Sequence, residues 1–310
     1  MDSSFAEYLD RRRREIDAAL IAALPAPPEC PPVVAEAMRY SVTAGGKRLR
    51  PILCLAAAEV VGGDSRTAMP AACAIELIHT YSLIHDDLPA MDNDTMRRGR
   101  PTLHVLAGEG MAILAGDGLL TEAFALLARL PDTIEPAIVA RKLRVSGVIA
   151  GAAGPTGMVG GQALDLAAAV VQAGGPVPRG DNAPDPEALR VMHSKKTGAL
   201  IRASAVAGAI MGGASDAVIA CVDAAAAEFG LAFQIVDDIL DVEGHSAQLG
   251  KTAGKDAVAG KHTYPALYGL DTARTMASEC LARAERGLVA ARLDDSRLMD
   301  IGRWIVNRSH

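Results

Sequence analysis

Aromatic residues are scarce in this sequence, with one Trp, four Phe and five Tyr among 310 residues. Half of all residues are nevertheless hydrophobic, so a large core must be built from aliphatic side chains. The alternation of polar and apolar residues that marks β-strands is also missing. Ala-rich segments with helical spacing are common instead, and the sequence therefore predicts an all-α protein.

An excess of basic residues is absent as well. The net charge at pH 7 is −6, whereas a nucleic-acid-binding surface needs clustered positive charge. We therefore expect no nucleic-acid partner.

Closely spaced cysteines are missing too. The five Cys residues are scattered and contain no CxxC spacing. This pattern predicts neither a disulfide framework nor a zinc site. We expect a reducing, cytoplasmic location.

Long uninterrupted apolar runs are not found. The first twenty residues include charged side chains and no apolar core of the signal-peptide type. Residues 145–164 form an uncharged run of membrane-spanning length, but six glycines and a proline interrupt it. We interpret it as buried helix pieces and expect no stable membrane insertion.

Two Pro-rich segments punctuate the chain, at residues 25–32 and 174–186. The first separates an amphipathic N-terminal helix from the rest. The second is a loop that ends in Asp185 as an N-cap and Pro186 at the first helical position. Neither segment has the composition of a domain linker, so we predict a single domain over residues 1–310. Apolar residues recur at helical spacing, predicting roughly ten helices, in segments 52–61, 71–88, 111–130, 134–150, 158–171, 187–212, 216–242, 263–292 and 296–306.

Four aspartates lie within nine residues of the segment HTYSLIHDDLPAMDND, residues 79–94. Asp86 and Asp92 are six residues apart, which on a straight helix would place them about 120° apart. Pro89 lies between them and cannot continue helical hydrogen bonding. The helix should therefore end or bulge before it, which lets Asp92 return beside Asp86. Asp87 is adjacent.

A second acidic cluster lies in FQIVDDILDVEG, residues 233–244, and contains Asp237, Asp238 and Asp241. Asp237 and Asp241 are four residues apart and share one helical face. One such cluster is compatible with a solvated helix face. Two clusters in apolar surroundings favour Mg²⁺, a hard cation that bridges carboxylates to phosphates.

Basic residues gather in the segments GGKRLRP, RRGRP, SKKTGAL and LGKTAGKD. Each segment alone resembles ordinary surface charge, but beside two acidic clusters they indicate phosphate-bearing ligands. His79 lies two turns before Asp86 on the same helical face, so it either points into that space or is a core residue. The basic side chains are Lys47, Arg48, Arg50, Arg97, Arg98, Arg100, Lys195, Lys196, Lys251 and Lys255.

Taken in order, these motifs resemble those of the short-chain trans-polyprenyl diphosphate synthases, the family of farnesyl and geranylgeranyl diphosphate synthases. The resemblance runs from about residue 40 to 265 and is strongest to the bacterial farnesyl type. It implies an all-α, single-domain helical bundle of the isoprenoid-synthase type around a deep central cavity, and a homodimer. It also implies the substrates, namely isopentenyl diphosphate and an allylic diphosphate.

The resemblance further assigns roles to residues. The metal ligands would be Asp86 and Asp92, with Asp87 in support, for two Mg²⁺ ions, and Asp237, with Asp238 and Asp241, for a third. The allylic diphosphate would be held by Arg97, Lys196 and Lys251. The diphosphate of isopentenyl diphosphate would be held by Lys47, Arg50, His79 and Arg98. Catalytic dipoles and polar cavity residues would be Lys196, Thr197, Gln234, Gln162 and Asp165, and Arg308 would assist closure over the substrate.

The implied reaction is a head-to-tail condensation. Metals and cations stabilise the departing diphosphate as the allylic carbon–oxygen bond ionises. The double bond of isopentenyl diphosphate attacks the carbocation, and a proton is then lost to the released diphosphate. An aliphatic lining excludes water, which fits the aromatic-poor composition.

Product length is predicted from Tyr81, five residues before Asp86, and from the Pro89-Ala90 insertion. Both resemble the bacterial farnesyl type, in which Tyr81, with Ser82, would form the floor beneath a fifteen-carbon chain. Alternatively, Tyr81 packs only against a neighbouring helix or a dimer interface. The rival functions are a geranylgeranyl diphosphate synthase, a terpene cyclase and a non-catalytic regulatory subunit. The two intact Asp motifs and GGKRLRP argue against the last two.

Overall fold

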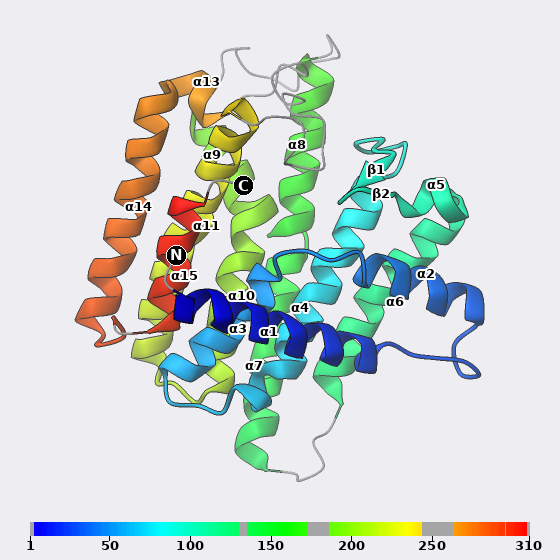
Figure 1. Cartoon of the computed structure of the whole chain (residues 1–310), viewed down its shortest axis with the longest axis horizontal. Helices are drawn as coiled ribbons and strands as arrows, with labels where there is room; N and C mark the ends of the chain where they lie inside the picture. The colour runs from blue at the N-terminus through cyan, green and yellow to red at the C-terminus, as the bar shows by residue number, and fades with distance from the viewer. Residues whose placement is uncertain (1–2, 130–134, 173–185, 244–262, 295, 309–310) are drawn as a thin grey trace. The chain divides into compact units, whose positions relative to one another are not determined.

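A computed structural model describes residues 3–129, 135–172, 186–243, 263–294 and 296–308. The described backbone is almost entirely helical, so the all-α prediction is confirmed (Figure 1). The helices are α1 (Ser3–Ala23), α2 (Pro32–Val42), α3 (Leu49–Val60), α4 (Ser65–Asp86), α5 (Leu103–Ala107), α6 (Glu109–Ala128), α7 (Pro136–Ala153), α8 (Met158–Gln172), α9 (Pro186–His193), α10 (Ala199–Met211), α11 (Asp216–Glu243), α13 (Tyr264–Tyr268), α14 (Leu270–Ala290) and α15 (Arg297–Asn307), with a π-helix η1 (Ser194–Gly198). Two strands, β1 (Met96–Arg97) and β2 (Arg100–Pro101), pair antiparallel.

The short hairpin is a correction to the strand-free prediction. Its turn residues, Arg98 with φ 52° and Gly99 with φ 73°, both lie in the left-handed region that two-residue hairpin turns favour. Strands of two residues are too short to show an alternating pattern. The predicted segment 263–292 is likewise two helices, because Gly269 adopts a φ of 82° and ends α13.

The chain forms two compact units. The first contains Met1–Gly147 and Ala207–Ser215, and the second contains Val148–Val206 and Asp216–His310. The boundaries fall inside helices α7 and α10. The assignment of one domain to residues 1–310 stays a prediction.

In the first unit, α4 packs against α1, α3 and α6 (Figure 1). The α4 core residues Ile75, Leu77 and Ile78 are fully buried. Close packing also depends on small residues, since a Cβ on Gly208 would lie 1.9 Å from the Cys54 carbonyl oxygen. This aliphatic core fixes α4, and with it the acidic cluster at its C-terminal end.

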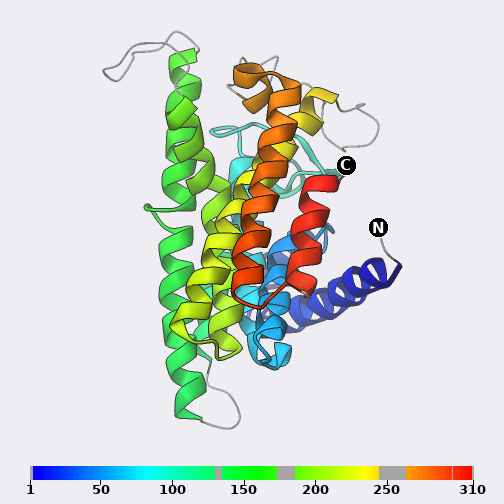
Figure 2. The ribbon, with the colours of Figure 1, turned by 90° about the vertical axis from the view of Figure 1, so that its left-hand side faces the viewer.

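In the second unit, α11, α14 and α15 lie side by side, as both ribbon views show (Figures 1 and 2). Phe229 of α11 is fully buried, and a Cβ on Gly302 of α15 would lie 2.3 Å from its ring. Glycine at that position therefore lets α15 approach α11. The packing holds the second acidic cluster near the C-terminal end of α11.

Helices α6 and α11 are long and apolar enough to cross a membrane by length and composition alone. Both, however, pack against neighbouring helices of their own unit, α6 against α4 and α11 against α14. A core helix of a globular protein has the same length and composition.

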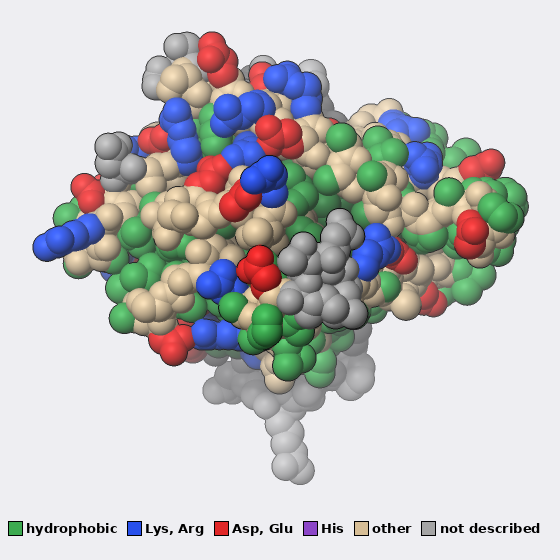
Figure 3. Space-filling view, turned by 90° about the horizontal axis from the view of Figure 1, so that it is seen from below, with side chains coloured by type: hydrophobic (Ala, Val, Ile, Leu, Met, Phe, Trp, Pro, Cys, Tyr) green, Lys and Arg blue, Asp and Glu red, His purple; other side chains and the backbone are tan. Residues whose placement is uncertain are grey.

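On the face shown in Figure 3, acidic and basic side chains of the described residues are interspersed.

Candidate active site

The first acidic cluster is built by the end of α4. The helix ends at Asp86, and the backbone N–H of Leu88 donates to the His85 carbonyl at 3.1 Å. The N–H of Asp92 then donates to the carbonyl of Asp86 at 2.9 Å. The loop therefore returns Asp92 to the helix end, as the position of Pro89 predicted. This places two carboxylate-bearing residues on one turn.

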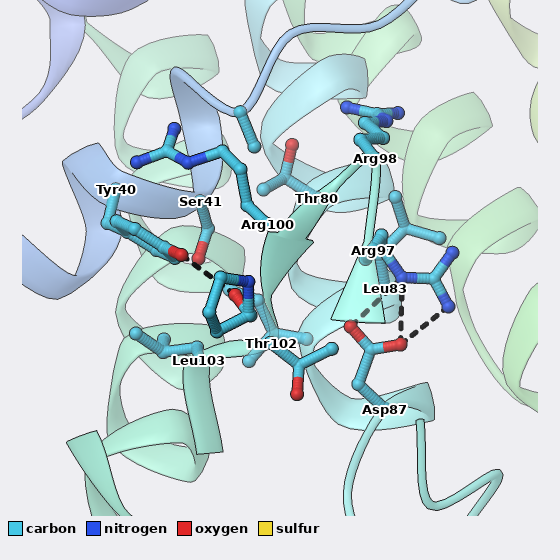
Figure 4. Close-up of a pocket in the computed structure, with 13 residues that line it drawn as sticks. Tyr40, Ser41, Thr80, Leu83, Asp87, Arg97, Arg98, Arg100, Thr102 and Leu103 are labelled. Atoms are coloured by element: carbon cyan, nitrogen blue, oxygen red, sulfur yellow. Dashed lines mark hydrogen bonds and ion pairs between the residues drawn. The ribbon is translucent and has the colours of Figure 1, made fainter. Parts of the chain in front are cut away.

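Asp87, in contrast, is engaged by Arg97 (Figure 4). The Nε of Arg97 donates to both carboxylate oxygens of Asp87, at 2.7 and 2.9 Å, and its Nη2 lies 2.5 Å from Oδ1. Burial alone would lower the pKa of Arg97, but Asp87, together with the charges of Asp94 and Asp86, more than offsets this and raises it. The role of Asp87 as a metal ligand stays a prediction. In the structure, Asp87 orients Arg97 on the hairpin. This role depends on a contact between residues ten apart in the sequence.

The hairpin contacts the GGKRLR loop through Arg98. Gly45 and Gly46 have φ values of 83° and 135°. Arg98 donates from Nη1 to the Gly45 carbonyl, and a Cβ on Gly46 would lie 2.8 Å from the Arg98 guanidinium. Two glycines therefore let Arg98 lie directly on the backbone beside Lys47.

These basic segments converge on His79. Burial, followed by the charges of Arg50, Arg98, Arg97 and Arg48, lowers the pKa of His79 well below its ordinary value. The imidazole is therefore neutral at physiological pH and lies among four guanidinium groups. Arg48 is buried, Arg50 and Arg97 are partly exposed and Arg98 is exposed. Positive charge gathered in this way is suited to a multiply charged anion.

A pocket in the first unit lies between α2, α4 and the hairpin (Figure 4). The hydroxyl of Tyr40 donates to the Pro101 carbonyl at 2.8 Å, and the Arg100 guanidinium lies 4.1 Å from the centre of the Tyr40 ring. These contacts anchor β2 on α2, and they fix the turn that carries Arg98. Sequence reasoning missed this role of Tyr40, because its partners lie some sixty residues away.

Tyr81 is 7% exposed, and its ring meets the ring of His85 edge to face at 5.6 Å. Burial and the charge of Asp86 raise the pKa of Tyr81. The Nε2 of His85 in turn lies 3.2 Å from the Ile113 carbonyl oxygen on α6. Ser82 donates from its hydroxyl to the His79 carbonyl at 2.9 Å. Tyr81 is thus held in a fixed position five residues before Asp86, while its role as a floor stays a prediction.

The second unit places Lys196 and Thr197 in the π-helix η1. The Nζ of Lys196 lies 2.5 Å from Oδ2 of Asp165 on α8. A Cβ on Gly161 would lie 2.1 Å from the Lys196 backbone nitrogen, so α8 approaches η1 only because Gly161 has no side chain. π-Helical turns often mark functional sites. The structure thus brings this segment together with the GGQALD motif, and the catalytic roles of Lys196 and Asp165 stay predictions.

Gln162 follows Gly161 on α8. Both polar atoms of its side-chain amide are buried, and neither has a hydrogen-bond partner in the described part of the chain. A buried amide without partners is costly unless a ligand or water satisfies it. Gln162 therefore fits the polar role that the sequence motif predicted.

Asp237 and Asp238 of the second acidic cluster have different partners. Asp237 accepts from Nη2 of Arg308 at 2.5 Å. Asp238 is 5% exposed and accepts from the Gln234 amide at 3.2 Å and from the Tyr264 backbone N–H at 2.9 Å. Asp238 thus fastens the start of α13 to α11. Gln234, for which the motif predicts a catalytic dipole, donates its side-chain hydrogen bond to Asp238. Their metal and catalytic roles stay predictions.

Within the described residues, no group of three or more His, Cys, Asp and Glu side chains is close enough to hold a metal ion. Mg²⁺ is commonly held by one or two carboxylates and completes its shell with water and substrate phosphate. Asp86 with Asp92, and Asp237 with Asp241, provide such pairs of hard oxygen donors. Lys251 and Lys255 lie outside the described residues.

The family defined as Polyprenyl synthetase matches residues 31–290. The chain belongs to this family. A dimethylallyltranstransferase of Fischerella ambigua is 44% identical over 98% of this chain and 84% of its own length. The large subunit 1 of a heterodimeric geranylgeranyl pyrophosphate synthase of Arabidopsis thaliana is 45% identical over 99% of this chain and 80% of its own.

A solved structure has a similar fold. An FPP/GFPP synthase from Zymomonas mobilis, solved as an apo structure, is 36% identical, covers 99% of this chain and 100% of its own, and has a TM-score of 0.83. The isoprenoid-synthase helical-bundle fold predicted from the motifs is therefore confirmed. This polyprenyl synthetase is a prenyltransferase that condenses isopentenyl diphosphate with an allylic diphosphate.

Proposed function

We propose that this polyprenyl synthetase extends dimethylallyl and geranyl diphosphate with isopentenyl diphosphate and releases farnesyl diphosphate. The observation that carries the proposal is the end of α4. There, a neutral His79 among four arginines lies two turns before the Asp86–Asp92 turn. The first unit thus carries a receptor for one diphosphate and, beside it, oxygen donors for metal ions.

Isopentenyl diphosphate binds at the cationic end of this arrangement. Lys47, Arg50 and Arg98 neutralise its diphosphate, and the neutral His79 supplies a hydrogen bond without adding a further charge. Arg98 and Lys47 act from one loop, because Arg98 already lies on the Gly45 carbonyl. This assembly needs no metal ion, which distinguishes it from the allylic position.

The allylic diphosphate is held through metal ions and separate cations. Asp86 and Asp92 would hold Mg²⁺ in the first unit, and Asp237 and Asp241 would hold Mg²⁺ in the second. When bound, Mg²⁺ would neutralise the charge that develops on the departing diphosphate. Asp87 supports the first pair indirectly by orienting Arg97, and Asp238 supports the second by fastening α13 to α11.

The remaining chemistry depends on side chains of the second unit. Lys196, oriented by Asp165, neutralises the leaving diphosphate, and the Thr197 hydroxyl and the Gln162 amide direct oxygen dipoles at the allylic cation. Gln234 assists from α11. The proton released after carbon–carbon bond formation passes to the released diphosphate. Lys251 is kept as a further diphosphate ligand on the basis of its motif.

The fifteen-carbon product is proposed from Tyr81. Its buried, edge-to-face packing on His85 supports a rigid obstacle five residues before Asp86. A second candidate is a twenty-carbon product. It is favoured by relatives such as geranylgeranyl pyrophosphate synthase 9 of Arabidopsis thaliana, which is 47% identical over 92% of this chain and 76% of its own length.

We also propose a homodimer. Helices α5 and α6 of the first unit expose the apolar side chains Val105, Leu106, Ile113 and Leu114, and their burial against a second copy would be favourable. Light scattering of the purified chain during size-exclusion chromatography tests this directly. A mass of one chain at micromolar concentration overturns the homodimer.

Function is tested by a product assay. Purified protein receives Mg²⁺, labelled isopentenyl diphosphate and, in turn, dimethylallyl, geranyl or farnesyl diphosphate, and chain length is read by chromatography. Farnesyl diphosphate as the end product, with little use of a farnesyl starter, is the expected result. A twenty-carbon product keeps the reaction and overturns the floor. Release of a cyclic hydrocarbon, or no product with any starter, overturns the elongation itself and leads to a cyclase or a regulatory subunit.

A further inference from the structure

Arg48 stands at the end of the loop that carries Lys47, and its side chain is only 3% exposed. Its φ of 50° lies in the left-handed region, which residues other than glycine rarely adopt. Its carbonyl accepts from the Ile52 N–H at 3.1 Å, so this residue is also the N-cap of α3. Such a strained backbone persists only where the surroundings hold it in place.

Three helices hold the Arg48 guanidinium. Its Nε donates to Oδ1 of Asp17 on α1 at 2.8 Å, and its Nη1 donates to Oε1 of Glu76 on α4 at 2.7 Å. Its Nη2 donates to the Val42 carbonyl at the end of α2 at 2.6 Å. Glu76 is also buried, at 3% exposure. The planar fork thus connects the loop to three elements through three different acceptors.

Arg48 does not itself face a ligand, since its charge is balanced by protein carboxylates. Its position in the chain matters instead. Lys47 precedes it and Arg50 follows it by two residues, whereas Glu76 lies one turn before His79 on α4. The Arg48–Glu76 pair therefore sets the distance between the loop and the helix on which His79 lies.

We propose that Arg48 and its buried counter-ion Glu76 are positioning residues for the isopentenyl diphosphate site. The pair fixes the loop so that Lys47 and Arg50 meet the same diphosphate as His79. This inference rests on the function proposed above and deepens it. It makes a specific claim: loss of the pair weakens the binding of isopentenyl diphosphate and leaves the binding of the allylic diphosphate unchanged.

The test uses the full chain with Arg48→Lys, which keeps the positive charge but cannot reach three acceptors at once. The Michaelis constant for isopentenyl diphosphate is expected to rise at least tenfold. The Michaelis constant for geranyl diphosphate should stay within twofold, and kcat at saturation within threefold. The control is Arg283→Lys in the second unit, where Arg283 forms a similar two-bonded pair with Glu228 at 3.0 and 2.9 Å. That control should leave all three constants unchanged.

A second variant guards against misfolding of Arg48→Lys. Asp17→Asn weakens only the half-exposed partner of the fork, and it should raise the Michaelis constant for isopentenyl diphosphate about threefold with the same selectivity. The positioning role is overturned if the Michaelis constants for both substrates rise equally. It is also overturned if thermal stability falls while all three constants stay unchanged. A wild-type protein that fails to elongate any starter overturns the proposed function instead. In that case calorimetric titration with isopentenyl diphosphate alone still compares wild type and variants, and equal affinities overturn the positioning role.

Discussion

The guanidinium of Arg308, just beyond the last helix, is bound to Asp237 of the second acidic cluster. Its Nη2 lies 2.5 Å from Oδ1 of Asp237 and donates to the Phe233 carbonyl at 2.8 Å. The guanidinium carbon also lies 4.0 Å from the centre of the Phe233 ring. A protein cation thus occupies a carboxylate that the family motif assigns to Mg²⁺.

Arg308→Ala should therefore lower the Mg²⁺ concentration needed for half-maximal activity. Asp237 is 43% exposed, so solvent screens the pair and its contribution is about 1 kcal/mol, or roughly a fivefold shift. A magnesium titration of initial rates measures this. Arg303→Ala is the control, because Arg303, on the helix that precedes Arg308, pairs instead with Glu285 at 3.0 Å. An unchanged or higher magnesium requirement in Arg308→Ala would show that the two cations do not compete.

Tyr81→Ala should lengthen the product. Removal of the buried ring opens space five residues before Asp86, and the fifteen-carbon product should give way to twenty carbons or more. Chromatography of the products measures the change. Tyr268→Ala is the control, since Tyr268 is an exposed tyrosine of the second unit. If Tyr81→Ala keeps the wild-type distribution, the ring only packs against its neighbours and is not the floor.

The depressed pKa of His79 predicts a pH-dependent stability. In the unfolded chain this imidazole protonates near its ordinary pKa of about 6.5, whereas burial and four arginines keep it neutral in the native state. The unfolded state therefore binds more protons below pH 6.5, and native stability falls there. Urea unfolding between pH 8 and 5 should show wild type losing up to ~1.4 kcal/mol per pH unit more than His79→Gln. Parallel curves would mean that His79 titrates normally in the folded protein.

Gly161→Ala should damage the catalytic end of the second unit. The added Cβ would lie 2.1 Å from the Lys196 backbone nitrogen, so α8 and η1 must separate. We expect a loss of about 1–3 kcal/mol in unfolding free energy and at least a tenfold lower kcat. Gly147→Ala on α7 is the matched control, because nothing lies within 4 Å of its Cβ, and it should be neutral or slightly stabilising. Wild-type kcat in Gly161→Ala would separate the η1 backbone from catalysis.

Much of the fold follows from local pattern. The apolar spacing predicted the segment 158–171, and helix α8 spans Met158–Gln172. Pro186 begins α9 as its first helical residue, while the capping residue Asp185 lies outside the described part. The strands of the hairpin and the five-residue helix α5 were missed, because segments this short contain too few residues to show a period.

The candidate site likewise has features that follow from the local sequence and features that depend on tertiary contacts. The return of Asp92 to Asp86 was predictable, since it depends on Pro89 between them. The motifs gave Asp87 a supporting role and Asp238 a ligand role in metal binding, whereas the structure shows both carboxylates bound to protein partners. Arg97 holds the first, and the Tyr264 backbone, 26 residues away, holds the second.

Most helices, the turn at the first acidic cluster and the family follow from the sequence alone, because they depend on residues close together along the chain or on motifs read in order. The electrostatic surroundings of each charged group, in contrast, depend on the tertiary structure. It placed four arginines around His79, closed Arg48 onto Glu76 and set Arg308 on Asp237. Charges interact through space, and their strength depends on distance and burial, which no local pattern contains.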